Sequence, residues 1–253
     1  MSLKLAAELS RYEALIIAVS GGVDSMTLAH FAQSVLGKRL RIVHALSPAV
    51  PARATNRVKE HAVRAGWHLD ILDSGEFDDP QYRANPVNRC YFCKSNLYSR
   101  IAKLTKGTIA SGTNKDDLSD FRPGLQAAEQ WQVVHPYVEV GFTKIQIYRL
   151  ARQLGLADLE ELPAEPCLAS RIETGIGVNP DDLAFVENVE TLLREESGPL
   201  AVIRCRITHL GVVIETNGPP PSASVINYCR DAGRTYLGYR PYQKGSAFLG
   251  ADE

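Results

Sequence analysis

The chain has 253 residues, of which 45% are hydrophobic and 23% are charged, with 28 Lys and Arg residues against 29 Asp and Glu residues. This composition is typical of a globular protein with a substantial core, in one large domain or two unequal ones. The net charge of −1 argues against a protein that binds nucleic acid through its overall charge, although a local basic patch is compatible with it.

The N-terminal stretch MSLKLAAELSRYEAL carries Glu8, Arg11 and Glu13 where a secretory signal would be uninterrupted and apolar. No run approaches the roughly 20 apolar residues that a membrane-spanning helix needs. The sequence therefore predicts a cytoplasmic protein without a membrane partner. Five cysteines, an odd number without secretory context, argue against a disulfide framework.

Short apolar runs alternate with helical patterns over the first part of the chain. Such runs predict buried strands, and apolar residues at helical spacing predict amphipathic helices between them. The expected strands are 14–19, 40–46, 67–72, 108–111 and 132–134, and the expected helices are 25–36, 52–65, 91–104 and 143–154. Strands that alternate with helices imply right-handed crossovers. We therefore predict an α/β fold with a doubly wound, mainly parallel sheet.

The pattern changes after about residue 178. Asn179 and Pro180, followed by two acids, give a helix start signal that suits the helix dipole. The segments beyond that helix predict a β-hairpin, a helix and a last strand, at 201–216, 222–232 and 235–239. We therefore predict two domains, residues 1–177 and a small α+β domain, residues 178–253, for substrate binding or oligomerisation.

The stretch SGGVDS, residues 20–25, joins the first expected strand to the following helix. Ligands bind beyond the carboxyl ends of parallel strands. Gly21 and Gly22 would let backbone N–H groups approach an anion, a helix N-terminus adds positive potential, and Ser20 and Ser25 add hydroxyls. Asp24 would repel phosphate by itself, so its presence is explained if Mg²⁺ bridges it to phosphate oxygens. A capped glycine turn is the alternative, but the strand–loop–helix setting favours phosphate binding.

SGGVDS is neither a Rossmann fingerprint nor a Walker loop, but in its setting it resembles the PP-loop of the ATP pyrophosphatases. That superfamily includes NAD and GMP synthetases and tRNA thiolases. The resemblance implies that the first domain cleaves ATP between the α and β phosphates, adenylates a carboxyl or carbonyl oxygen and releases pyrophosphate. GTNKDD, residues 112–117, resembles the second nucleotide-site segment of these enzymes. This implies that Gly112 and Thr113 line the site, and that Asp116 or Asp117 helps to hold Mg²⁺ or the activated substrate.

Three of the cysteines lie in polar segments that contain proline. Cys90 and Cys93 form a CxxC motif at the start of an expected helix, and Cys167 lies in EPCLASR. A four-thiolate zinc site is incomplete without a second CxxC, whereas three thiolates could hold a 4Fe–4S cluster with one iron open to carry sulfide. The alternatives are a thioredoxin-like pair, a nucleophile or sulfur donor at Cys167 favoured by Arg171, and simple burial.

NPVNRCYFCKSNLY, EPCLASRIETG, SGGVDS, GTNKDDLSDFRPG and the Arg-x-Arg hairpin together resemble the LarE family of ATP-dependent sulfur insertases, over nearly the whole chain. The resemblance implies a substrate, pyridinium-3,5-biscarboxylic acid mononucleotide, on the way to the nickel-pincer nucleotide cofactor. It also implies a homo-oligomer. Sulfur replaces AMP on an adenylated carboxylate and comes either from a sacrificial cysteine in CLASR or from a cluster. Because Cys90, Cys93 and Cys167 are all present, we favour the cluster, with Cys167 as a ligand.

Two arginines on the expected hairpin are candidates for substrate binding. Alternation along a strand places Arg204 and Arg206 on one face and Cys205 on the other. Two guanidiniums suit a phosphate, and the resemblance implies that they hold the phosphate of the nucleotide with Glu190 nearby. A solvated basic strand face is the alternative. Cys205 and Cys229 are expected to be structural.

Arg122 in DFRPG and Arg171 in CLASR are expected to contact phosphate or the adenylate, with ordinary ion pairs as the alternative. Three other functions stay open for the whole chain. An iron–sulfur tRNA thiolase would need a basic groove that is not evident, and an amidating ligase similar to NAD synthetase has no use for three cysteines. The third is a nucleotide-binding sensor without catalysis.

Overall fold

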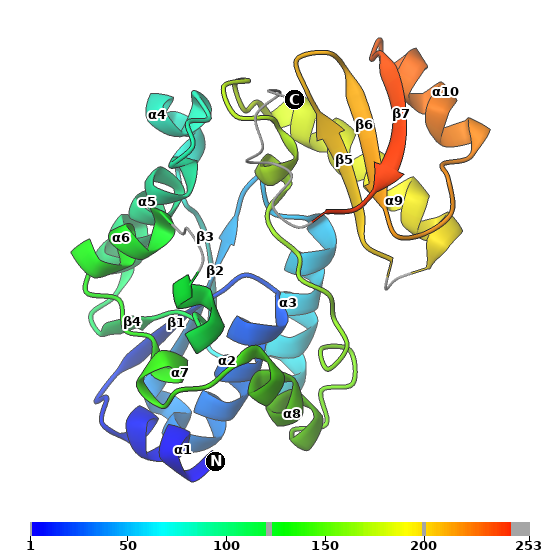
Figure 1. Cartoon of the computed structure of the whole chain (residues 1–253). Helices are drawn as coiled ribbons and strands as arrows, with labels where there is room; N and C mark the ends of the chain where they lie inside the picture. The colour runs from blue at the N-terminus through cyan, green and yellow to red at the C-terminus, as the bar shows by residue number, and fades with distance from the viewer. Residues whose placement is uncertain (1, 120–122, 199–200, 244–253) are drawn as a thin grey trace. The chain divides into compact units, whose positions relative to one another are not determined.

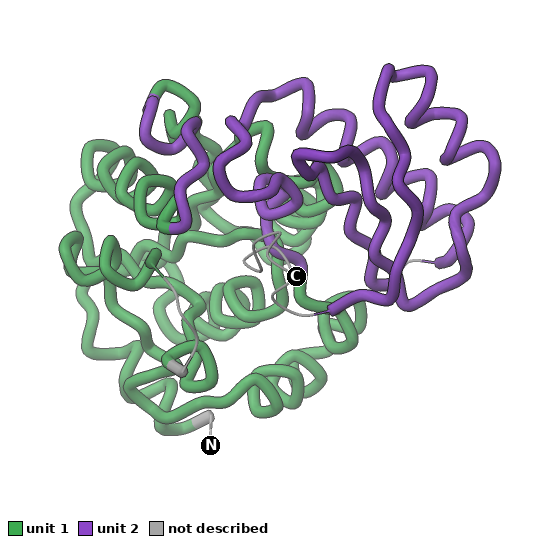
Figure 2. The backbone as a smooth tube through the Cα atoms, turned by 45° about the horizontal axis from the view of Figure 1, so that its top comes forward, with its two compact units in different colours: residues 1–78, 88–164 green, residues 79–87, 165–253 purple. Residues whose placement is uncertain are grey.

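The computed structural model describes residues 2–119, 123–198 and 201–243. The chain divides into two compact units, of which unit 1 comprises residues 1–78 and 88–164, and unit 2 comprises residues 79–87 and 165–253 (Figure 2). Unit 2 thus includes a short segment, residues 79–87, that separates the two parts of unit 1 in the sequence. The division into domains 1–177 and 178–253 stays a prediction. The compact units have different bounds.

Unit 1 is built on a four-stranded parallel sheet in the order β3–β2–β1–β4 (Figure 1). The strands are β1 Leu15–Val19, β2 Leu40–Leu46, β3 Leu69–Asp73 and β4 Thr108–Ala110. In the register of the sheet, Leu15 pairs with Leu40 on one side and with Thr108 on the other. The strand order therefore reverses between β1 and β4, which is where open parallel sheets bind ligands.

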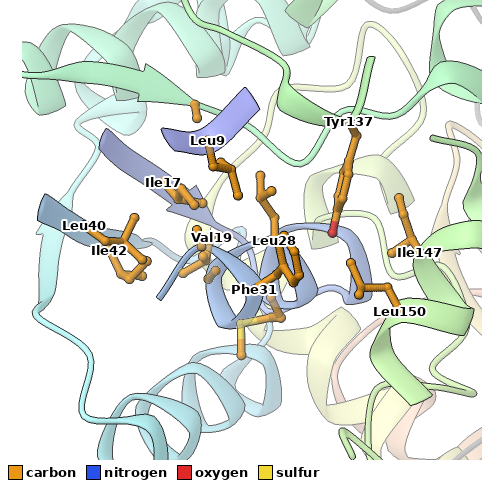
Figure 3. Packing of buried hydrophobic residues seen from close by; sticks show 14 of the residues in the cluster. Leu9, Ile17, Val19, Leu28, Phe31, Leu40, Ile42, Tyr137, Ile147 and Leu150 are labelled. Atoms are coloured by element: carbon orange, nitrogen blue, oxygen red, sulfur yellow. The ribbon is translucent and has the colours of Figure 1, made fainter. Parts of the chain in front are cut away.

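Helices cover both faces of this sheet because its central strands are apolar on both sides. The helices of unit 1 are α1 Ser2–Ser10, α2 Val23–Leu36, α3 Ala52–Ala65, α5 Arg89–Leu104, α6 Pro123–Gln130, α7 Pro136–Glu139 and α8 Lys144–Gln153. Ile17 and Ile42 pack in one cluster with residues of α1, α2, α3 and α8 (Figure 3). Ile16 and Val43 face the other way and pack with α5 and α6. The doubly wound α/β fold predicted from the sequence is confirmed.

Local sequence signals explain several helix ends. Thr143 and Gln146 form a capping box at the start of α8, and Gly66 closes α3 with φ of 62°, a left-handed conformation that suits glycine. Asn179 accepts a hydrogen bond from the amide of Asp182 at the start of the next long helix. Among the described residues, no helix combines the length and the apolar character needed to cross a membrane.

Unit 2 contains a three-stranded sheet in which β6 lies between β5 and β7. Its strands are β5 Ile203–Ile207, β6 Val212–Thr216 and β7 Tyr236–Pro241, and its helices are α4 Pro80–Arg83, α9 Pro180–Ser197 and α10 Ala223–Asp231. β5 and β6 form the expected antiparallel hairpin, and β7 runs parallel to β6. The side-chain amide of Asn85 donates to the carbonyls of Glu173 and Ile176, each at 2.8 Å, and so attaches the inserted segment to this unit.

Two expectations on secondary structure need correction. The strand expected at 132–134 is reduced to one isolated bridge between Ala110 and Val134. α1 was not expected, yet Leu5 and Leu9, one helical turn apart, are fully buried in the main core. An N-terminal helix therefore shields the side of the sheet that α2 and α8 also cover.

Candidate active site

The SGGVDS loop lies directly after β1 and continues into α2, which begins at Val23 and not at Ser25 as expected. Gly21 has φ of 82°, and a Cβ there would lie 2.7 Å from the carbonyl oxygen of Ala54, so only glycine fits. The amide of Ser20 donates to Oγ of Ser25 at 3.1 Å, which closes the turn on itself. The loop thus places a helix N-terminus, small side chains and two hydroxyls at the carboxyl edge of the sheet, an arrangement that suits phosphate.

The segment after β4 packs against this loop. A Cβ on Gly112 would lie 2.6 Å from the backbone nitrogen of Ser25, so the backbone of residue 112 packs directly against the backbone of residue 25. Oγ1 of Thr113 lies 2.8 Å from Oγ of Ser111, which in turn lies 2.8 Å from Nδ1 of His135. The structure therefore brings Gly112 and Thr113 to the switch point between β1 and β4, beside the SGGVDS loop.

An acidic cluster follows from the same two segments. Nδ2 of Asn114 lies 3.4 Å from Oδ1 of Asp24 and 3.0 Å from Oδ2 of Asp117, so one amide lies against both carboxylates. Nζ of Lys144, from the first turn of α8, lies 2.5 Å from Oδ2 of Asp24. The backbone amide of Lys144 donates to Asp116 at 2.8 Å. Both acids of GTNKDD are thereby fixed near the loop, and Lys144 and Asn114, which the sequence analysis did not assign to the site, contact them.

The donor set of this cluster fits magnesium. Mg²⁺ prefers oxygen ligands and usually takes one or two carboxylates, with phosphate oxygens and waters completing its shell. Asp24 and Asp117 offer two carboxylates that converge on one amide. Within the described part of the chain, no group of three or more His, Cys, Asp and Glu side chains could hold a metal ion by itself. Two carboxylates suit a metal whose remaining ligands are phosphate oxygens and waters.

His44 supports the end of β1. Its ring is 1% exposed, with Nδ1 2.9 Å from the carbonyl oxygen of Val19 and Nε2 2.9 Å from Oγ1 of Thr55. Since a carbonyl only accepts, Nδ1 donates to Val19 and neutral Nε2 accepts from the hydroxyl. Burial lowers the pKa of His44. The neutral ring thus fixes the strand end immediately before Ser20, a role the sequence did not reveal.

The three cysteines singled out in the sequence lie at partly exposed positions and are not in disulfides. Cys90 and Cys93 lie at the start of α5 in unit 1, where a spacing of three residues places both on one helix face. Cys167 lies just before a short 3-10 helix, Leu168–Arg171, in unit 2. Reduced, accessible thiols are the donors that an iron–sulfur cluster takes.

Cys205 and Cys229 differ from these three. Both side chains are fully buried in unit 2, and burial raises the pKa of both thiols. A buried thiol with a raised pKa is a poor nucleophile and a poor metal ligand. Their environment is thus that of structural residues.

Arg171 and Glu190 form a fully buried, bidentate ion pair in unit 2. Nε of Arg171 donates to Oε1 of Glu190 at 2.8 Å and Nη2 donates to Oε2 at 3.0 Å. Burial alone would raise the pKa of Glu190, but Arg171 and then Arg194 outweigh it and lower that pKa to about 2. Nη1 of Arg171 also donates to the carbonyl oxygen of Cys167 at 3.0 Å. The pair therefore holds the backbone of the CLASR segment beside α9.

Arg204 and Arg206 are less exposed than a solvated strand face would be, at 4% and 8%. Arg206 pairs with Glu215 at 2.9 Å and donates to the carbonyl oxygen of Ser170 at 2.7 Å. Burial, and then repulsion from Arg171, lowers the pKa of Arg204 to about 10. The alternative of a solvated basic face is therefore wrong. Arg122, the remaining candidate, lies outside the described residues.

No family model matches the chain. A Synechocystis protein named "Uncharacterized protein slr1717" is 36% identical over 183 residues, which cover 71% of this chain and 68% of that protein. A Lactiplantibacillus plantarum protein named "Pyridinium-3,5-bisthiocarboxylic acid mononucleotide synthase" is 26% identical over 205 residues, with coverage of 79% and 74%. One component of the glutamine-hydrolyzing GMP synthase of Thermoplasma acidophilum is 28% identical over 210 residues, with coverage of 73% and 67%.

The parallel sheet, the glycine loop after its first strand and these similarities together define an ATP-using enzyme of the PP-loop class. Within that class, the chain belongs to the same family as the Synechocystis protein.

Proposed function

We propose that the chain is an ATP-dependent sulfur transferase that acts on pyridinium-3,5-biscarboxylic acid mononucleotide. A carboxylate oxygen of the substrate attacks the α-phosphorus of ATP, and pyrophosphate leaves. A sulfur nucleophile then attacks the carboxyl carbon of the adenylate, the bond to AMP breaks, and a thiocarboxylate remains. A second round gives the dithio product for nickel-pincer cofactor synthesis. The observation that carries the proposal is the combination, in one chain, of this nucleotide loop with three partly exposed cysteines that lie outside any disulfide.

The first half-reaction takes place at the loop and the acidic cluster of unit 1. Backbone amides at the start of α2, with Ser20 and Ser25, bind the phosphates of ATP, and Gly112 lets the second segment approach them. Asp24 and Asp117 would hold Mg²⁺, which supplies positive charge to the phosphates when it is bound. Asn114 keeps the two carboxylates oriented.

The sulfur step uses the thiols. Cys90, Cys93 and Cys167 would hold a 4Fe–4S cluster, whose fourth iron can carry a sulfide when the cluster is present. The second route gives the sulfur of Cys167 itself: its thiolate attacks the adenylate, AMP leaves, and elimination across Cα and Cβ yields dehydroalanine and the thiocarboxylate. We favour the first route because Cys90 and Cys93 form a pair on one face of α5.

The small-molecule partner also needs a phosphate site. Arg204 and Arg206 are candidates for it, with Arg171 and Glu190 holding the neighbouring CLASR segment in place. The similarity to the Lactiplantibacillus plantarum synthase supports a mononucleotide as the substrate. We also expect a homo-oligomer, by the same resemblance.

Pyrophosphate release tests the adenylation step. The wild-type protein should release pyrophosphate from MgATP only when the pyridinium biscarboxylate mononucleotide is added, and Asp24→Asn should lose this release. Cys167→Ala should still release pyrophosphate but form no thiocarboxylate. Pyrophosphate release that is independent of this substrate would contradict the proposal.

A second candidate is amidation, favoured by the similarity to the GMP synthase component. It requires ammonia in place of sulfur as the nucleophile. If Cys167→Ala forms the amide as fast as the wild type with ammonium as the only nucleophile, the function is amidation and not sulfur transfer.

A further inference from the structure

The first two turns of α3 pack against the SGGVDS loop in unit 1. A Cβ on Gly21 would lie 2.7 Å from the carbonyl oxygen of Ala54 and 2.9 Å from its Cβ, so the loop is in close contact with the helix. Arg57 lies three residues beyond Ala54 on α3, and residues at this spacing share a helix face. Its Nη1 donates to the carbonyl oxygen of Gly21 at 2.7 Å. A cation of α3 thus binds a backbone carbonyl of the nucleotide loop.

This hydrogen bond fixes the direction of one peptide group, the one that joins Gly21 to Gly22. In a trans peptide, the carbonyl oxygen and the following N–H point in opposite directions. The carbonyl oxygen of Gly21 is turned to Arg57, so the amide of Gly22 points away from it. That amide lies 3.4 Å from Oγ of Ser20, which lies 3.3 Å from Oγ of Ser25. The Gly22 amide is therefore directed toward the two hydroxyls that we propose as phosphate donors.

The two glycines give this peptide little resistance to rotation. Gly21 has φ of 82°, whereas Gly22 has φ of −82° and ψ of 160°. Glycine populates both signs of φ about equally well, so the peptide could turn over and direct its carbonyl oxygen, with its partial negative charge, toward a phosphate. A hydrogen bond from a guanidinium is charge-assisted and stronger than one between neutral groups. Arg57 therefore favours the peptide orientation that an anion requires.

We infer that Arg57 is a positioning residue of the nucleotide site: by binding the carbonyl oxygen of Gly21, it keeps the amide of Gly22 directed at a phosphate of ATP. The inference rests on the proposed function for its nucleotide site, but not for sulfur transfer. Arg57 acts through the loop and takes no part in bond making. It lies outside both SGGVDS and GTNKDD, on the helix that follows the second strand.

ATP binding by calorimetry in the presence of Mg²⁺ gives the first test. Arg57→Met removes the charge and the donor, whereas Arg57→Lys keeps a cation that can donate to the carbonyl. Arg57→Met should bind ATP about tenfold more weakly, and Arg57→Lys should stay within about threefold of the wild type. Lys59→Met, at an exposed position of the same helix, is the matched control and should keep the wild-type affinity.

A spectroscopic measurement distinguishes positioning from a general loss of charge. In protein labelled with ¹⁵N-glycine, the amide resonance of Gly22 is identified by its absence from the spectrum of Gly22→Ala. In ligand-free Arg57→Met this resonance should shift or broaden, because the peptide loses its fixed direction, whereas glycine resonances outside the loop keep their positions. Addition of ATP with Mg²⁺ should shift the same resonance downfield in the wild type, because the amide then donates to a phosphate.

Unchanged ATP affinity in Arg57→Met, or a ligand-free Gly22 resonance identical to that of the wild type, would overturn this inference alone. A wild-type protein that binds no ATP would overturn both the inference and the proposed function. ATP binding that depends on Arg57, without any thiocarboxylate formed by the wild type, would support the inference and contradict the proposed function. If Arg57→Met does not fold, Arg57→Gln takes its place, and the same affinity and resonance decide.

Discussion

Gly112 and Ser25 meet through their backbones: a Cβ on Gly112 would lie 2.6 Å from the amide nitrogen of Ser25 and 2.8 Å from its Cα. The segment after β4 and the first turn of α2 are therefore in direct contact at the point where the strand order reverses. This contact places the acids of GTNKDD next to the phosphate loop. It leaves no room for any side chain at residue 112.

The first prediction follows from this contact. Gly112→Ala should force the two segments apart, weaken ATP binding at least about tenfold and cost about 1 to 3 kcal/mol of stability, as overpacking does. Calorimetric titration with ATP and urea unfolding measure the two effects. Gly177→Ala is the control, because its added Cβ would lie at an ordinary 3.5 Å from the carbonyl oxygen of Arg83. Equal ATP affinities for the two variants would contradict the assignment of the loop.

The second prediction concerns the buried pair of Arg171 and Glu190. Glu190→Gln leaves the guanidinium of Arg171 without a charged partner in a fully buried place, which should cost about 3 to 5 kcal/mol. Glu195→Gln, on an exposed position of the same helix, should cost almost nothing. Urea unfolding at neutral pH compares the two. A loss below about 1 kcal/mol for Glu190→Gln would show that the pair does not organise unit 2.

The same pair sets a pH dependence. The folded pKa of Glu190, about 2, lies below its ordinary value of 4.5. The stability contributed by its charge is therefore fully present above pH 4.5 and is lost as the pH falls toward 2. Unfolding free energies measured between pH 6 and pH 3 should fall more steeply for the wild type than for Glu190→Gln.

A third prediction concerns histidines of unit 1. Nε2 of His30 lies 2.6 Å from Nδ1 of His61, whose Nε2 lies 2.6 Å from Oδ2 of Asp158. Burial, then the neighbouring His61 and Arg64, lower the pKa of His30 from 6.5 to about 4. The unfolded chain therefore binds this proton more readily, so stability is full above pH 6.5 and falls as the pH decreases toward 4.

His30→Gln should flatten this part of the stability curve by about 1 kcal/mol, a discounted value because the ring is partly exposed. Thermal unfolding of both proteins between pH 7 and pH 4 measures it. His68→Gln, which lies outside this hydrogen-bonded set, should leave the curve unchanged. If the stability of His30→Gln changes with pH as steeply as that of the wild type, the lowered pKa of His30 is not the cause of this pH dependence.

The strands and most helices follow from the sequence because their apolar periodicity is local. β2 and α3 have the expected bounds, since a β-branched run and a helical stripe need no distant information. The strand predicted at 132–134 is wrong because its two apolar residues, Val133 and Val134, are too few to distinguish a strand from a single bridge. α1 was not predicted because its fully buried leucines, Leu5 and Leu9, form only a short apolar stripe.

The site was predictable in its motifs but not in its contacts. In SGGVDS and in GTNKDD the functional residues lie next to one another in the sequence, so each motif can be recognised locally. The structure brings both motifs to one sheet edge. Lys144 meets Asp24 across 120 residues of chain, and no local pattern encodes such a pair. A lysine at the first helical position, against the helix dipole, was the one available signal.

A fourth prediction concerns iron. Anaerobically reconstituted protein should contain about four irons per chain with an absorption band near roughly 400 nm, and Cys90→Ala should lose both. Ser95→Ala, on the same helix outside the CxxC, should keep them. Iron that persists in Cys90→Ala would exclude a cluster ligand at that position. No iron in the wild type would leave Cys167 as the sulfur donor and predict dehydroalanine there after one turnover.

The central claim, sulfur transfer to an adenylated carboxylate, is tested most directly by the mass of the substrate after reaction. Anaerobic protein with MgATP, sulfide and the pyridinium biscarboxylate mononucleotide should convert the substrate to a species in which sulfur replaces carboxyl oxygen, with one AMP formed per sulfur. Cys167→Ala should form none of it. Formation of AMP and pyrophosphate by the wild type, with an amide or unchanged carboxylate as the only product, would contradict the claim.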